Sequence, residues 1–131
     1  MQGAINWVQS KLNEKTLEYP IFLDVEDSQI SSLNKDMLTS LCKQFCERLE
    51  GFKTGVYANL DWFNNKLYTG ELTDYKIWLA QWTNANNHSA TFKVDMWQYT
   101  SDGQIDGING RVDLNYCLNC EENENVTGLY L

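Results

Sequence analysis

The chain has 131 residues with 43% hydrophobic and 21% charged side chains, which is enough for one globular domain with its own core. Its net charge of -8, without any cluster of Lys or Arg, argues against nucleic-acid binding, and no apolar run reaches the roughly 20 residues that a membrane helix needs. Met1–Trp7 lacks a basic region followed by an apolar core, so no secretory signal is expected.

The first half of the chain alternates predicted helices with predicted strands. Helical spacing of apolar residues predicts a helix from Ala4 to about Leu17, which the residues before Pro20 end. A second helix is expected over about 35–50, with N-caps among residues 31–34 and Gly51 behind it. The predicted strands follow these helices at 21–25 and 53–58, and a short helical stretch begins at 61–64. This alternation predicts parallel βα units.

The second half contains strands with little helix between them. Strands are predicted over 75–82, 93–99 and 110–116, with a polar loop at 84–89 and glycine turns after residue 102. We expect one domain over residues 1–117, and an acidic, frayed tail over 118–131.

The four cysteines form two close pairs. Cys42 and Cys46 match the apolar face of the second helix and are predicted to be buried thiols. Cys117 and Cys120 form a single CxxC, which favours neither zinc nor redox catalysis because His88 is the only histidine and no strand-to-helix turn contains the motif. A disulfide between Cys117 and Cys120 stays open.

Two acids end the first predicted strand. Asp24 and Glu26 are two residues apart, so they point to the same face at the carboxyl end of a buried parallel strand, where such sheets carry functional residues. Paired carboxylates there suit general acid/base chemistry on a glycosidic bond, although a solvated strand end is the plainer interpretation. The five Trp and seven Tyr provide rings that stack on sugars or fill a core.

An ordered series of motifs extends this pattern. It consists of Phe22-Leu-Asp-Val-Glu26, Gly55-Val-Tyr-Ala-Asn59, Ile77-Trp-Leu-Ala80, Trp97-Gln-Tyr-Thr-Ser101 and Gly107-Ile-Asn-Gly-Arg-Val-Asp-Leu-Asn115. Together these motifs resemble the family 25 glycoside hydrolases, the lysozymes of phages, bacteria and some fungi. The resemblance implies a modified, TIM-like α/β barrel with five βα units and three further strands. It also implies cleavage of peptidoglycan between N-acetylmuramic acid and N-acetylglucosamine.

The resemblance assigns roles to individual residues. Glu26 resembles the general acid, Asp24 its neighbouring carboxylate, and Asp113 the acid on the last strand. The aromatic residues that resemble the lining of the cleft are Tyr57, Trp78, Trp82 and Trp97. Neighbouring carboxylates and partial burial would keep a proton on such an acid near neutral pH, and the remaining negative charge would stabilise an oxocarbenium-like transition state. The attacking group, an enzyme carboxylate or the substrate's acetamido group, is left open, and no metal or cofactor is implied.

The chain departs from the family pattern at its beginning. The family starts with an earlier strand that carries an Asp-Val-Ser-like segment, followed by two further βα units, whereas this chain begins in what resembles the third helix. Five strands cannot easily close an eight-stranded barrel, so the 21–25 strand and the last strand are expected to be open edges. We therefore expect a homo-oligomer or a complementing N-terminal chain, with peptidoglycan glycan strands as the substrate partner.

Three functions remain compatible with this sequence. The first is a muramidase that uses Glu26, Asp24 and Asp113. The second is a truncated, catalytically weak module that binds glycan or assembles with a partner. The third is a generic α/β domain with chance acids. The chitinase-type hydrolases are disfavoured because the acids that precede their Asp-x-Glu are missing here, as at Phe22.

Overall fold

Four parallel strands and one antiparallel strand form the sheet at the centre of the fold. The computed structural model describes residues 2–12, 19–49 and 51–119. The strands lie side by side in chain order, β1-β2-β3-β4-β5, and only the β4–β5 pair is antiparallel. Their bounds are β1 (Ile21–Asp24), β2 (Thr54–Asn59), β3 (Lys76–Ala80), β4 (Met96–Gly103) and β5 (Val112–Cys117).

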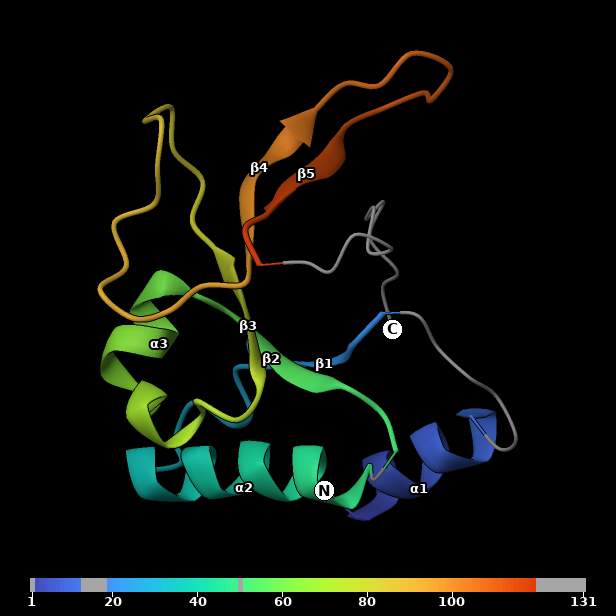
Figure 1. Cartoon of the computed structure of the whole chain (residues 1–131), viewed down its shortest axis with the longest axis vertical. Coiled ribbons are helices and arrows are strands. Elements are labelled where there is room, and N and C mark those ends of the chain that lie inside the picture. Colours follow the sequence, from blue (N-terminus) through green and yellow to red (C-terminus); the bar gives the residue numbers. More distant parts are fainter. Residues whose placement is uncertain (1, 13–18, 50, 120–131) are drawn as a thin grey trace.

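Helix α1 precedes β1, while α2 and α3 follow β1 and β2 along the chain. The bounds are α1 (Gln2–Leu12), α2 (Lys35–Arg48), α3 (Leu60–Asn65) and a 3-10 turn, η1 (Thr69–Glu71). Figure 1 shows α1, α2 and α3 grouped around β1 to β3, while β4 and β5 extend away from the helices as a long hairpin. The predicted α/β fold with parallel strands and flanking helices, a partial TIM-like barrel, is confirmed. Within the described residues the sheet is open, and β1 and β5 are its edges.

Helix α2 shows how the sequence sets these elements. The Asn34 side-chain oxygen accepts a hydrogen bond from the Met37 amide at 2.8 Å and so caps the helix. The buried face of α2 includes Cys42 and Cys46, which are free thiols as predicted. Burial is the main cause that raises the pKa of Cys42 to about 12 and that of Cys46 to about 11, so both thiols stay protonated and unreactive.

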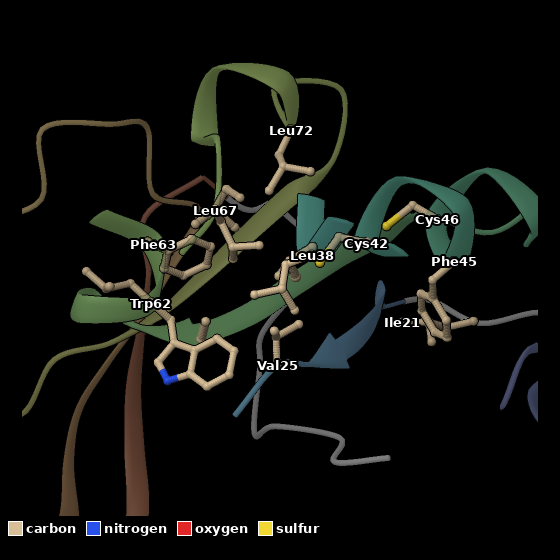
Figure 2. Packing of buried hydrophobic residues seen from close by; sticks show 14 of the residues in the cluster. Ile21, Val25, Leu38, Cys42, Phe45, Cys46, Trp62, Phe63, Leu67 and Leu72 are labelled. Atoms are coloured by element: carbon tan, nitrogen blue, oxygen red, sulfur yellow. The ribbon is translucent and has the colours of Figure 1, made fainter. Parts of the chain in front are cut away.

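One face of the sheet packs against the helices, and we call it the helix face. Because strand side chains alternate, every second residue of β1 to β4 reaches this face. The buried residues there and on the helices include Ile21, Val25, Leu38, Phe45, Val56, Ala58, Trp62, Phe63, Ile77, Leu79 and Trp97. Figure 2 shows side chains from α2, β1 and α3 meeting in this layer. The helix face therefore supplies the core and leaves the opposite face of the sheet for other contacts.

A buried carboxylate joins the start of β4 to its neighbours. Asp95 is 3% exposed, and its Oδ2 accepts a hydrogen bond from the Ile77 amide at 2.8 Å. Its Oδ1 accepts one from the Asn119 side chain at 2.9 Å and lies 3.4 Å from the ammonium of Lys93. The main-chain carbonyl of Asp95 accepts bonds from the amides of Leu118 and Asn119. Asp95 thus connects β3, β4 and the end of β5.

Several predicted boundaries differ from the structure. The fourth strand begins at Met96 rather than at residue 93, because the side chain of Asp95 occupies the ladder position before it. The same strand runs on to Gly103, since β-bulges keep it paired with β5 beyond residue 99. The first helix is described as far as Leu12, and residues 13–17 of its predicted range lie outside the described residues.

The C-terminal segment is described only in part. Cys117 is disulfide-bonded, whereas Cys120 and the predicted acidic tail from residue 120 onward lie outside the described residues. No helix in the described part of the chain has the length and apolar character to cross a membrane.

Candidate active site

The face of the sheet opposite the helices, which we call the inner face, brings together most of the predicted site residues. Register places Asp24 of β1 beside Tyr57 of β2, and Tyr57 beside Trp78 of β3. Gln98 of β4 lies opposite Asn115 of β5. Since side chains two apart share a face, Glu26 follows Asp24, and Asp113 precedes Asn115, on the inner face.

The side chains of Asp24 and Glu26 are hydrogen-bonded to each other. Burial, the charge of Glu26 and a hydrogen bond with Glu26 together raise the pKa of Asp24 from 3.8 to about 6. The side chain of Asp24 is still exposed by surface area, so burial, the largest of these causes, is only partial. Asp24 therefore keeps its proton to a higher pH than an ordinary aspartate does.

The hydroxyl of Tyr57 lies within electrostatic reach of all three predicted acids. Burial is the largest cause that raises its pKa to about 12, followed by the charges of Glu26, Asp24 and Asp113 in that order. The charges of all three predicted acids therefore act on one phenol, that of Tyr57. The phenol itself stays protonated across the physiological pH range.

Trp78 lies beside Tyr57 on the inner face of the sheet. Its ring meets Tyr57 edge-on at 4.8 Å between centroids and Phe22 at 5.3 Å. Its indole N–H donates to the Asn115 side-chain oxygen at 2.7 Å. Contacts between β1, β2, β3 and β5 on one face show that the sheet is strongly curved, as the wall of a barrel is.

Trp82 stands at the rim of the inner face. It follows β3, it is 62% exposed, and its indole N–H donates to the Gln98 side-chain oxygen at 2.9 Å. The hydroxyl of Tyr57 donates to the same oxygen at 3.1 Å. An exposed indole ring held at one edge offers a flat apolar surface to a ligand.

Trp97 lies apart from the other predicted aromatic residues. It points to the helix face, it is 3% exposed, and its indole N–H donates to the main-chain carbonyl of Gln81 at 2.9 Å. His88, Tyr99 and Tyr116 surround its ring. The structure thus places Trp97 in the core and not beside the acids.

Two residues of the inner face were missed by sequence reasoning. Gln98 follows Trp97, so strand alternation alone would have placed it on the opposite face once Trp97 was assigned to the core. Asn115 lies two residues after Asp113 and shares its face by the same rule. Amides of this kind leave no compositional signal, because Gln and Asn are common on exposed strands as well.

The described residues contain no group of three or more His, Cys, Asp and Glu side chains arranged to hold a metal ion. For chemistry, the inner face offers an aspartate with a raised pKa that is hydrogen-bonded to Glu26, a third acid, a neutral phenol and two indole rings.

The chain is similar to known proteins over most of its length. The family model described as glycosyl hydrolases family 25 matches residues 2–108. The uncharacterized protein YegX of Escherichia coli O157:H7 is 28% identical over 121 residues, which cover 88% of this chain and 44% of that protein. This chain therefore spans less than half the length of the curated relatives that it matches.

Solved structures show the same relation. The CTP1L endolysin is 26% identical with a TM-score of 0.73, over 88% of this chain and 41% of that one. The modular autolysin LytC from Streptococcus pneumoniae is 26% identical with a TM-score of 0.64, over 84% of this chain and 28% of that one.

Proposed function

Because this chain belongs to glycosyl hydrolases family 25, we propose that it acts on peptidoglycan as a muramidase. The bond to be cleaved is the β-1,4 bond between N-acetylmuramic acid and N-acetylglucosamine. Residues 1–117 supply part of the catalytic barrel in this proposal. The similarity to an endolysin and an autolysin supports the substrate class.

One observation carries the proposal. Asp24 lies beside Tyr57 in the register of β1 and β2, and its side chain is hydrogen-bonded to that of Glu26. Asp113 comes from β5 at the other edge of the sheet, and the charges of all three acids raise the pKa of Tyr57. Placing like charges near one another costs free energy, so three acids around one half-buried tyrosine favour a functional site over a chance arrangement.

The roles follow from the charges. Glu26 donates a proton to the glycosidic oxygen, and Asp24 shares that proton through the hydrogen bond between the two carboxyls. Once the proton has left, the pair carries more negative charge, which stabilises the positive charge developing on the sugar. Asp113 adds a further carboxylate to this field from β5.

The aromatic residues bind the sugar in this proposal. Trp82 presents an exposed ring at the rim, while Trp78 and Tyr57 form the floor beside the acids. Trp97 is omitted from the binding set, because it is buried on the helix face.

The test is cleavage of purified peptidoglycan by the 131-residue chain. We expect soluble muropeptides to be released, and Glu26→Gln to reduce this release by about 100-fold or more, as loss of a general acid does. Asp106→Asn is the matched control, since Asp106 is exposed in the loop between β4 and β5. Equal release by the Glu26→Gln variant and the wild type would contradict the proposal.

A second function is favoured by the open edge of the sheet. In the described residues β1 pairs only with β2, and the chain covers 41% of the CTP1L endolysin. We propose that another polypeptide pairs with β1, either a complementing N-terminal chain or a second copy, and that without it the chain binds glycan while cleaving it weakly. Co-sedimentation with insoluble peptidoglycan measures the binding, and sedimentation velocity measures the assembly. A purely monomeric, folded chain at micromolar concentration would contradict the assembly.

A further inference from the structure

Gln98 occupies the centre of the inner face. It is 1% exposed, and its register neighbours are Ala80 on β3 and Asn115 on β5. Its main-chain carbonyl accepts a hydrogen bond from the Gln81 amide at 3.1 Å, which fixes the backbone on which its side chain stands. A fully buried amide needs partners for its polar atoms, so its surroundings must be organised around it.

Two donors meet at one atom of Gln98. The phenol of Tyr57, from β2, and the indole of Trp82, from the segment after β3, both donate to Oε1, at 3.1 and 2.9 Å. An indole N–H can only donate, so the amide atom that faces it is the oxygen and not the nitrogen. A carbonyl oxygen has two lone pairs, and here both are used.

We propose that Gln98 is a positioning residue of the inner face, which holds Tyr57 and Trp82 in the orientation that the substrate meets. The inference rests on the proposed muramidase function and adds a residue through which the binding rings act. The indole N–H is the one hydrogen-bond donor of the Trp82 side chain, and it donates to Gln98.

The hydrogen bond to Gln98 also fixes the direction in which the Tyr57 O–H points. Because the Tyr57 proton points to Gln98, the lone pairs of the phenol oxygen are left for the side of the acids. That oxygen is then able to accept a hydrogen bond from an O–H or N–H of a bound sugar. Loss of Gln98 frees the phenol proton to turn towards the carboxylates, where it would compete for the negative charge.

The first experiment replaces Gln98 with methionine, which has a similar length and no carbonyl. The readout that does not depend on activity is the indole N–H signal of Trp82 in ¹H–¹⁵N NMR, assigned by its loss in Trp82→Phe. We expect this signal to shift and to exchange faster with solvent in Gln98→Met. Gln98→Glu keeps an acceptor and should restore slow exchange. Gln81→Met is the matched control, since that side chain bonds Ser89 in the loop.

The kinetic readout uses the same variants on soluble glycan fragments of peptidoglycan. Misplaced binding groups reduce kcat/KM by about 10- to 100-fold, so we expect a fall of that size in Gln98→Met and none in Gln81→Met. A folded Gln98→Met variant with an unchanged Trp82 signal, or with the kinetics of Gln81→Met, overturns the positioning role.

The positioning role can still be tested if Gln98→Met does not fold or if the wild-type chain is inactive. If Gln98→Met does not fold, Tyr57→Phe, Trp82→Phe and the double variant are measured in its place. If the double variant reduces kcat/KM by less than the product of the two single reductions, the two side chains share Gln98 as an anchor. A reduction equal to that product overturns the positioning role. If the wild-type chain cleaves nothing, the proposed muramidase function fails, while the Trp82 signal and glycan binding of the same variants still decide the positioning role.

Discussion

The raised pKa of Asp24 makes a prediction about folding stability that is independent of catalysis. An Asp whose pKa is higher in the folded chain than in the unfolded chain binds protons more tightly when folded. Stability contributed by the protonated form is complete below pH 3.8 and is lost as the pH rises through about 6. Asp24→Asn removes the charge, so the variant should be the more stable protein above pH 6 and equal to the wild type near pH 3.

The size of the effect follows from the same values. A pKa change from 3.8 to about 6 corresponds to about 3 kcal/mol for a fully buried group. Because Asp24 is exposed and solvent screens its charge, we expect about 1 kcal/mol. For a chain of 131 residues this gain raises Tm by about 3 to 5 °C at pH 7.

Urea denaturation of wild type, Asp24→Asn and Asp106→Asn at pH 3 to 8 measures the difference. The curve of wild-type stability minus Asp24→Asn stability should decline between pH 4 and 6 and then level off, and the Asp106→Asn difference should be flat. A variant that is less stable than the wild type at pH 7 would refute the argument, since it would mean that the Asp24 charge is favourably paired in the fold.

The remaining predictions concern activity and packing. Cleavage should fall about tenfold per pH unit above pH 6 to 7 as the acid pair loses its proton, and a profile flat to pH 9 would exclude that pair as the proton donor. Asp95→Ala should lower the free energy of unfolding by about 2 to 4 kcal/mol in urea, because it leaves the buried Ile77 amide without its acceptor; a loss under about 0.5 kcal/mol would contradict this. Gly55→Ala should lower the free energy of unfolding by about 2 kcal/mol or more, since a Cβ there would collide with the main-chain carbonyl oxygen of Lys76. Gly70 has open space around it, so Gly70→Ala should change that free energy by under about 0.5 kcal/mol. Equal melting temperatures of the two variants would contradict the close approach at Gly55.

The regular elements could be predicted because local patterns determine them. The cap at Asn34, the apolar stripe with Cys42 and Cys46, and the apolar run that begins at Ile21 are each visible in short windows of sequence. Strand boundaries near Asp95 could not be predicted, since they depend on a side chain bonded to a residue 18 positions away.

The candidate site was also predictable from the sequence only in part. The pairing of Asp24 with Glu26 follows from strand alternation, and the structure adds a hydrogen bond and a raised pKa on Asp24. That Trp97 turns to the core while Gln98 turns to the inner face depends on which face of β4 the helices cover, a tertiary property. The catalytic and binding roles of the predicted residues stay predictions until variants are measured.

The most direct measurement identifies the sugar at the new chain end. Purified peptidoglycan is incubated with the 131-residue chain, reduced with borohydride and hydrolysed, and the reduced amino sugars are identified by mass spectrometry, with Glu26→Gln alongside. The proposed muramidase predicts reduced muramic acid that is absent with Glu26→Gln. Reduced glucosamine instead, or no reduced sugar above the Glu26→Gln background from a folded protein, would contradict it.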